Sequence, residues 1–317
     1  MPAQHSAKAR LPRAGAYSPT LTFFNQDESI DLHNTVEHAL WLARSGLAGL
    51  VVMGTNGEAP LVEREERLQI LKAIQNALVA EGLTNCDLIV GCGAQSLRST
   101  LLLIEDAKSA GAAAALVLPP SYWAAALSKA AILQFYDDVC ASSSLPVMAY
   151  NFPAVTGGIN LTSDDLLQLA KRNANFVGVK LTCGNVGTAH RVASTLGPER
   201  FLTLGGRSES ALHMLLGGAS GVIAASANLA PKSHVKLCEL WKKGDLKDAM
   251  DLQTLLSNAD TQASKGGIGG LKAHACTIRG LPFEHARVRS PLVTPSAAEV
   301  IEDTSALGQL LAYERSL

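Results

Sequence analysis

Hydrophobic residues along this chain gather into eight short runs, which are separated by longer segments of helical periodicity. The runs are rich in Val, Leu, Ile and Ala and do not alternate with polar residues. Continuous apolar strands of this kind are typical of a parallel sheet that is covered on both faces. We expect strands near residues 17–22, 48–53, 87–92, 113–118, 146–151, 176–181, 201–204 and 220–225.

The intervening segments have the ends that helices need. Segment 30–46 carries apolar residues on one face and finishes at Gly46, which suits a helix C-terminus. Another helix is expected to begin at Thr162 or Ser163, since either side chain can cap the first turn and acidic residues follow.

This alternation of strands and helices predicts an α/β fold, a (β/α)8 TIM barrel. A doubly wound sheet is the alternative, because periodicity alone does not show that a sheet closes. From about residue 232 onward the pattern is helical only. We therefore expect a disordered N-terminal tail over residues 1–14, a barrel catalytic domain over 15–231 and a C-terminal helical domain over 232–317.

Composition narrows the classes of partner. Charged residues make up 17% of the 317 positions and hydrophobic residues 47%, whereas the usual charged share is about a quarter. Either the core is large or some surface is buried between subunits. The net charge of -1 provides no basic face for nucleic acid. Since no apolar run approaches the roughly 18 residues of a membrane span, we expect a small-molecule partner and no membrane.

Cysteine spacing argues against a metal or disulfide framework. None of the six cysteines forms a C-x-x-C pair, and no Cys/His cluster has the spacing of a zinc site. We expect reduced thiols and no metal. The N-terminal segment is basic and lacks the apolar stretch of a secretory signal. These features favour a cytoplasmic location, with the mitochondrial matrix as the alternative.

Lys180, near the end of the sixth apolar run, is the first candidate for chemistry. The active site of a (β/α)8 barrel lies at the C-terminal ends of its strands. Apolar surroundings disfavour the ammonium form of a lysine, and a neutral amine is a nucleophile for carbonyl groups. The alternative is a lysine that reaches solvent or pairs with a distant carboxylate. No Asp or Glu lies within ten residues on either side.

Three further candidates follow other predicted strands. Thr55 and Asn56 lie in the turn GTNGE, whose backbone N–H groups can form a nest for an anion such as a carboxylate. An ordinary turn with a helix cap is the alternative. Tyr150 ends the fifth apolar run, where a phenol can relay protons. A core tyrosine with a satisfied hydroxyl is the alternative there.

The last two strands end in small or apolar residues. Gly206 and Ile223 suit either the lining of a ligand pocket or close packing. The polar candidates on the neighbouring loops are Ser208, Glu209 and Ser226, and the sequence does not rank them as binding residues.

Taken together, the motifs resemble the dihydrodipicolinate synthase / N-acetylneuraminate lyase family of pyruvate-dependent class I aldolases. Within it the chain is most similar to 4-hydroxy-2-oxoglutarate and 2-keto-3-deoxy sugar-acid aldolases. The resemblance runs from about Tyr17 to about Leu292. It rests on GTNGEAPLVEREER, LPPSYW, YNFPAVTG, GVKLTCG, LGGRSES and GVIAASANLAP, which occur in the order that the family has.

The resemblance implies roles for individual residues. Lys180 would form a Schiff base with a 2-keto acid, and Tyr150 would relay the proton. Tyr122, in LPPSYW, would cross a dimer interface to support the relay in a neighbouring site. Thr55 and Asn56 would bind the carboxylate of the keto acid.

The resemblance also implies a pyruvate pocket lined by Gly206 and Ile223. It implies a barrel with a C-terminal helical domain and a homotetramer built as a dimer of dimers. No cofactor and no metal are expected, since the substrate is held covalently on the lysine.

Two departures from the synthase pattern bear on the reaction. Dihydrodipicolinate synthases usually carry Arg two residues after the Pro of the Tyr-Asn-x-Pro motif, and here that position is Val155. The missing charge-assisted bond would cost about 1.5–3 kcal/mol in binding a second carboxylate. The turn also has Thr-Asn where synthases usually have Thr-Thr.

Both departures favour cleavage of a 4-hydroxy-2-keto acid to pyruvate and an aldehyde over dihydrodipicolinate synthesis, which remains the alternative. A non-catalytic keto-acid sensor on the same fold is disfavoured, because the lysine and the tyrosine are both present.

Overall fold

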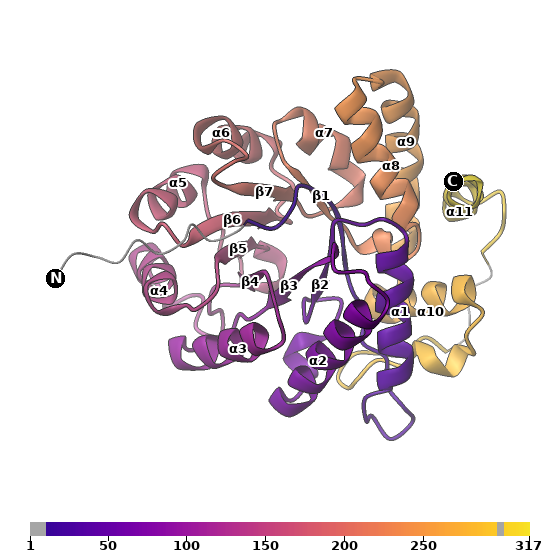
Figure 1. The fold of residues 1–317 in the computed structure, drawn as a ribbon, viewed down its shortest axis with the longest axis horizontal. Coiled ribbons are helices and arrows are strands. Elements are labelled where there is room, and N and C mark those ends of the chain that lie inside the picture. The colour runs from indigo at the N-terminus through magenta and orange to yellow at the C-terminus, as the bar shows by residue number, and fades with distance from the viewer. Residues whose placement is uncertain (1–10, 297–300) are drawn as a thin grey trace.

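Eight parallel strands close into a barrel, as the sequence predicted (Figure 1). The computed structural model describes residues 11–296 and 301–317. Each strand pairs in parallel with the next strand along the chain, and β8 pairs with β1 to close the ring. The TIM-barrel prediction is confirmed. The strands are β1 Gly15–Pro19, β2 Gly49–Val52, β3 Asp87–Gly91, β4 Ala114–Val117, β5 Val147–Asn151, β6 Phe176–Leu181, β7 Leu202–Gly205 and β8 Gly221–Ile223.

Helices cover the outside of the strands (Figure 1). Most of them begin with a side-chain cap. At the start of the fifth helix the cap is Thr162, whose hydroxyl accepts the N–H of Asp165. The ring consists of α1 Leu32–Arg44, α2 Arg64–Ala80, α3 Leu97–Ser109, α4 Lys129–Ser142, α5 Ser163–Arg172, α6 Val186–Leu196, α7 Ala211–Leu216 and α8 Pro231–Lys243.

Three helices follow the ring, namely α9 Leu246–Ala263, α10 Gly267–Arg279 and α11 Ala306–Ser316. The expected boundary between residues 231 and 232 falls at the start of α8. This helix packs against β1 and α7 and so completes the ring, as well as against α9. By its contacts α8 packs on both the barrel and the helices that follow it, and the predicted boundary stays a prediction.

The apolar residues form two cores, because successive side chains of a strand point to opposite sides. Val51 lies inside the barrel, whereas Val52 packs against the surrounding helices. This arrangement explains why the strands read as continuous apolar runs. The barrel interior contains Tyr17, Val51, Ile89, Ala114, Leu116, Met148, Tyr150, Val177, Leu202, Leu204 and Ile223.

The last helix is attached to the ring by a buried carboxylate. Glu314 of α11 accepts hydrogen bonds from the N–H groups of Lys232 and Ser233, at 2.9 and 2.7 Å, and from the Ser233 hydroxyl at 2.6 Å. The carboxylate thus caps the N-terminus of α8, where the helix dipole favours a negative charge. The C-terminal helix is therefore held by a polar anchor as well as by packing on α9.

Part of the expected N-terminal tail is packed in the structure. Residues 1–10 lie outside the described residues. The backbone N–H of Arg13 donates to the Asp87 carboxylate at 2.8 Å, and its guanidinium donates to the Ala48 carbonyl at 2.9 Å. Leu11 packs on the barrel interior, so this part of the expected tail of residues 1–14 contacts the barrel.

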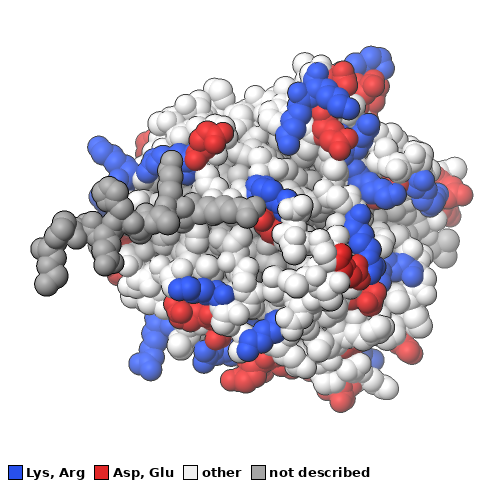
Figure 2. All heavy atoms as spheres, viewed as in Figure 1, with Lys and Arg blue, Asp and Glu red and all other residues white. Residues whose placement is uncertain are grey.

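The surface carries no large field of one charge on the face seen in Figure 2, where acidic and basic side chains are interspersed among uncharged ones. Within residues 11–296 and 301–317, no helix combines the length and the hydropathy that crossing a bilayer requires.

Candidate active site

Tyr150 and Lys180 come together at the ends of two neighbouring strands. They are direct partners in the register of β5 and β6. The Lys180 Nζ donates to the Tyr150 hydroxyl at 3.1 Å and lies 4.2 Å from the centre of its ring. Both side chains are almost fully buried, with exposed fractions of 3% and 4%. The lysine is therefore not a surface group that reaches solvent, and its recorded contact is a phenol rather than a carboxylate.

Thr55 extends this contact into a chain of three side chains. Its hydroxyl lies 3.3 Å from the Tyr150 hydroxyl, so one phenol contacts both the amine and the threonine. The turn after β2 and the end of β6, both singled out in the sequence, thus meet at Tyr150. An amine, a phenol and an alcohol in contact can pass a proton along hydrogen bonds.

The turn that carries Thr55 has an unusual backbone. Met53 and Glu58 flank it with φ values of 57° and 54°, in the left-handed region that non-glycine residues rarely adopt. Hydrogen bonds within the turn run back to the carbonyls of Gly54 and Thr55. These bonds do not use the N–H groups of Thr55 and Asn56. Among the described residues no hydrogen bond to either N–H group is recorded, so two adjacent donors can serve a ligand, as in the anion nest that the sequence predicts.

Asn56 adds a donor of its own. Its Nδ2 atom is buried and has no hydrogen-bond partner among the described residues. A buried, unpaired donor is costly, and a carboxylate oxygen would satisfy it. The Asn56 side chain therefore fits the anion-binding role better than that of a helix cap.

Gly206 and Ile223 take different places. A Cβ on Gly206 would lie 2.1 Å from the Thr182 hydroxyl oxygen, so the glycine is required where the loop after β7 touches the end of β6. Its N–H donates to the Leu181 carbonyl at 3.0 Å. Ile223 is fully buried in the barrel interior, in the same cluster as Tyr150. Gly206 thus makes a close approach that requires glycine, and Ile223 lies in the apolar cluster that contains the Tyr150 ring.

Tyr122 lies apart from the other predicted residues. Its side chain is 78% exposed and packs edge-on against Trp123, with ring centres 5.0 Å apart. The Gln95 side-chain oxygen accepts the N–H groups of Ser121 and Tyr122 at 2.8 and 2.9 Å and so fixes the segment. Two neighbouring aromatic rings are therefore presented to the surroundings on a fixed backbone.

A cavity of about 270 Å³ opens beside the turn, between the barrel and the helical extension. It is lined by Thr55, Asn56, Phe152, Ala225, Ser226, Asp260, Ala263, Ser264, Gly267, Ile268 and Leu271. The sequence did not point to α9 and α10 as walls of the site. No sequence signal shows which face of an added helix will meet the barrel.

A buried chain of hydrogen bonds ends at this cavity. His234 Nδ1 lies 2.8 Å from the Ala230 carbonyl, so Nδ1 carries the proton and Nε2 accepts from the Ser208 hydroxyl at 2.8 Å. Burial lowers the pKa of His234, which keeps the ring neutral. Ser208 also contacts the hydroxyl of Ser226, which must then be the donor. Ser226 is left with only lone pairs for a further partner, and its side chain is fully buried at the edge of the cavity.

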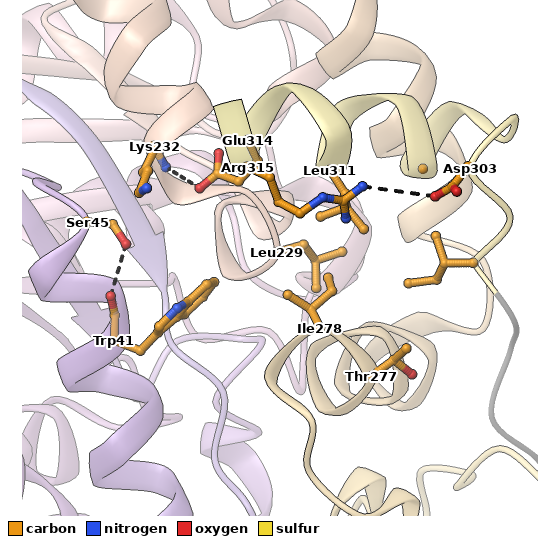
Figure 3. Close-up of a pocket in the computed structure, with 12 residues that line it drawn as sticks. Trp41, Ser45, Leu229, Lys232, Thr277, Ile278, Asp303, Leu311, Glu314 and Arg315 are labelled. Carbon is orange, nitrogen blue, oxygen red and sulfur yellow. Dashed lines mark hydrogen bonds and ion pairs between the residues drawn. The ribbon is translucent and has the colours of Figure 1, made fainter. Parts of the chain in front are cut away.

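A second cavity, of about 410 Å³, lies between α1, α8, α10 and α11 (Figure 3). The Trp41 indole extends into it from α1, and Leu229 and Ile278 form its apolar centre. Arg315 at its rim lies 4.0 Å from an oxygen of Asp303. This second cavity is formed by outer helices rather than by the strand ends. We therefore take the cavity at the barrel mouth as the candidate active site.

Within the described residues, no group of three or more His, Cys, Asp or Glu side chains could hold a metal ion. The six cysteines are free thiols. Burial raises the pKa of the thiols of Cys92 and Cys140 to about 12, so they are protonated at neutral pH.

The model of the dihydrodipicolinate synthetase family matches residues 13–309. The chain belongs to this family. Its relatives match over nearly the whole chain. It is 41% identical over 303 residues to the "Probable 4-hydroxy-2-oxoglutarate aldolase, mitochondrial" of Emericella nidulans, which covers 96% of both chains. It is 38% identical to the "L-threo-3-deoxy-hexylosonate aldolase" of Hypocrea jecorina, over 98% of this chain and 100% of the relative.

A solved structure of a family member is also similar. It is described as "a putative dihydrodipicolinate synthase family protein from Coccidioides immitis". The TM-score is 0.84 at 38% identity, and the match covers 97% of this chain and 99% of the other. The predicted family, barrel and helical extension are thus confirmed for this chain.

In the present chain, Val155 is the residue that the resemblance places where synthases usually have arginine. It lies in the short 3-10 helix η2, Pro153–Val155, directly after β5, and its side chain is 42% exposed. An aliphatic side chain there offers no donor to a second carboxylate.

Proposed function

We propose that this protein is a class I aldolase that cleaves a 4-hydroxy-2-keto acid to pyruvate and an aldehyde. The observation that carries the proposal is the contact chain from Lys180 Nζ through the Tyr150 hydroxyl to the Thr55 hydroxyl. The proposal is supported by the closeness of a buried amine, a phenol and a turn whose N–H groups can bind an anion. The family membership agrees with carbon–carbon lyase chemistry.

In the proposed mechanism, the Lys180 amine attacks the C2 carbonyl of the keto acid. The Tyr150 phenol gives its proton to the hydroxyl group of this adduct, which leaves as water, and the products are a protonated imine and the Tyr150 phenolate. The carboxylate is held by the N–H groups of Thr55 and Asn56. Tyr150 removes the proton of the C4 hydroxyl. The C3–C4 bond then breaks, its electron pair moves toward the imine to form an enamine, and the aldehyde leaves.

The second half of the cycle regenerates the amine. Tyr150 returns the proton that it accepted to C3 of the enamine, which becomes the protonated imine of pyruvate. Water then adds to C2, the Tyr150 phenolate accepts the proton that this step releases, and pyruvate leaves the Lys180 amine. The substrate on the lysine serves as the electron sink, so the proposed cycle uses no cofactor and no metal.

Polarity at the cavity favours one group of substrates. Asp260 lines the cavity, and its carboxylate can accept hydrogen bonds from the hydroxyl groups of a 2-keto-3-deoxy sugar acid. The second carboxylate of 4-hydroxy-2-oxoglutarate would meet a like charge at Asp260. We therefore expect a higher kcat/KM for the sugar acids than for 4-hydroxy-2-oxoglutarate.

The alternative, condensation of pyruvate with aspartate semialdehyde, is less supported. That substrate brings a carboxylate, and Val155 offers it no charge. The relatives from Emericella nidulans and Hypocrea jecorina are both named aldolases.

Assembly and location are part of the proposal. The exposed rings of Tyr122 and Trp123 suit an interface in which Tyr122 reaches the site of a neighbouring subunit, within a homotetramer. The Emericella nidulans relative carries "mitochondrial" in its name. That name favours the mitochondrial matrix over the cytoplasm for this chain.

The first test is to trap the imine. The protein is incubated with pyruvate and sodium borohydride, and the modified peptide is mapped by mass spectrometry. We expect a reduced pyruvyl adduct on Lys180. The matched control is a Lys171→Ala variant, which lacks an exposed lysine of α5 and should give the same adduct. Absence of an adduct on folded protein would overturn the Schiff-base mechanism.

A further inference from the structure

A fully buried ion pair joins the helical extension to the turn after β2. Lys272 of α10 pairs with the carboxylate of Glu58, and neither side chain has any exposed surface. The same Lys272 Nζ donates to the Arg287 carbonyl at 2.8 Å and lies 4.5 Å from the centre of the Phe24 ring. Burial lowers the pKa of Lys272 to about 8, and the Glu58 carboxylate opposes that shift.

Glu58 is the residue that ends the anion nest. Its φ of 54° is one of the two left-handed conformations that flank the turn. Its N–H donates to the Thr55 carbonyl at 3.0 Å, which fixes the peptide orientation next to the two free donors. The Thr22 hydroxyl donates to the Gly57 carbonyl at 2.8 Å. Because Glu58 is part of the turn, a shift of its side chain would also shift the N–H groups of Thr55 and Asn56.

A second contact from the C-terminal part of the chain reaches the same carboxylate. The N–H of Arg289 donates to the other Glu58 oxygen at 2.9 Å. The Arg289 guanidinium binds both carboxylate oxygens of Glu66 at 2.7 and 2.8 Å, and it donates to the Leu61 carbonyl at 2.7 Å. Residues 272 and 289 thus hold the segment from Glu58 to the start of α2 from outside the barrel.

We propose that Lys272 is a positioning residue for the keto-acid carboxylate: its ion pair with Glu58 holds the Gly54–Glu58 turn so that the N–H groups of Thr55 and Asn56 face the substrate. The inference rests on the proposed function. A gain in stability does not by itself account for the pair, because replacing a buried ion pair by uncharged residues of similar size is often neutral for stability. A strained turn that must present two donors has a separate need for a fixed carboxylate.

The test compares how imine formation on Lys180 depends on pyruvate concentration. The variants are Lys272→Met, Glu58→Gln and the double variant Lys272→Met/Glu58→Gln. The double variant removes both charges but keeps a side-chain oxygen for the N–H of Arg289. The control is Lys247→Met, which removes a lysine that is 87% exposed and whose ion pair with Asp251 lies on the surface.

We expect the double variant to melt within a few degrees of the wild type. It should need at least tenfold more pyruvate for half-maximal borohydride trapping, while the amount trapped at saturation is unchanged. The same split should appear in cleavage, with KM raised and kcat retained. Lys247→Met should match the wild type in both readouts.

The outcomes separate this inference from the proposed function. If the double variant folds and traps pyruvate with the wild-type concentration dependence, the pair only stabilises the fold and the positioning role is overturned. A wild-type protein that forms no adduct at any pyruvate concentration would instead overturn the aldolase proposal. Should either single variant fail to fold because one charge is left buried and unpaired, the double variant still decides the question.

Discussion

Tyr150 and Lys180 lie opposite one another on β5 and β6, and this register sets the 3.1 Å contact between the amine and the phenol. Because side chains of a strand alternate between its two faces, a slip of one residue would move Lys180 to the helix-covered side. The contact is therefore a property of the barrel itself rather than of a loop. Chemistry built on two paired strands is held as rigidly as the sheet.

Replacement of the lysine should abolish turnover without unfolding the barrel. In Lys180→Ala we expect no borohydride adduct and no cleavage of any 4-hydroxy-2-keto acid, because the only proposed nucleophile is gone. Mass spectrometry, a cleavage assay and a thermal melt check these points. Normal activity in this variant would show that another group forms the imine.

Removal of the phenolic hydroxyl should separate imine formation from bond cleavage. Tyr150→Phe keeps the ring but loses the group between Lys180 and Thr55, so trapping should persist while cleavage slows about 10²–10⁴-fold. The matched control is Tyr17→Phe in the same barrel interior, whose hydroxyl donates to the Arg13 carbonyl. It should lose about 1 kcal/mol of stability and keep its cleavage rate. Equal rates in Tyr150→Phe and wild type would remove Tyr150 from the relay.

A shared site predicts complementation between inactive subunits. If Tyr122 serves the neighbouring site, Tyr122→Phe and Lys180→Ala homomers should each be nearly inactive. Hybrids that contain both kinds of subunit should recover part of the activity, since one type of site in the hybrid then has an intact lysine and an intact tyrosine. Native mass spectrometry verifies the hybrids. Inactive hybrids of confirmed composition would count against a site shared in this way.

Acid should destabilise the fold through His38. Burial lowers the pKa of His38 to about 3, although its bond to Asn228 favours the charged form, and Arg279 disfavours that form further. The unfolded chain, with a pKa near 6.5, takes up the proton first as the pH falls. Stability is therefore lost from about pH 6.5 downward toward pH 3.

Urea unfolding at pH 7.5 and 5.5 measures this loss. Proton uptake by His38 in the unfolded chain should lower the free energy of unfolding by about 1.4 kcal/mol at pH 5.5 relative to pH 7.5. His38→Gln can still donate to Asn228 but does not titrate, so its difference between the two pH values should be smaller by that amount. The same difference in variant and wild type would assign the acid sensitivity to other groups.

The strands and the reactive side chains could be predicted because their signals are local. An apolar run marks each strand wherever it lies, and Lys180 stands out against such a run. The contact between Tyr150 and Lys180 could not be predicted, since it depends on the register of two strands. Gly206 shows the same limit, because its need for glycine comes from the close approach of Thr182.

Lys272 was missed although it carries the signal that drew attention to Lys180. It too lies among small and apolar residues, with no acidic residue within ten positions on either side. Its partner Glu58 is far away along the chain, and the helical pattern around it reads as a surface-packed extension. A lysine without local acids is thus a useful signal in helices as well as at strand ends.

The Glu58–Lys272 pair has a consequence for how new specificities can arise on this scaffold. In the proposed site, the turn that would bind the keto-acid carboxylate is held from outside the barrel. The cavity that would receive the rest of the substrate is formed by the end of β5, the loop after β8 and the facing sides of α9 and α10. Mutations in that second region can alter the accepted aldehyde while the common half of the reaction stays intact. An engineer seeking a different carbon–carbon bond to cleave would leave residues 54–58 and 272 untouched and diversify positions such as Phe152, Ser226 and Ser264.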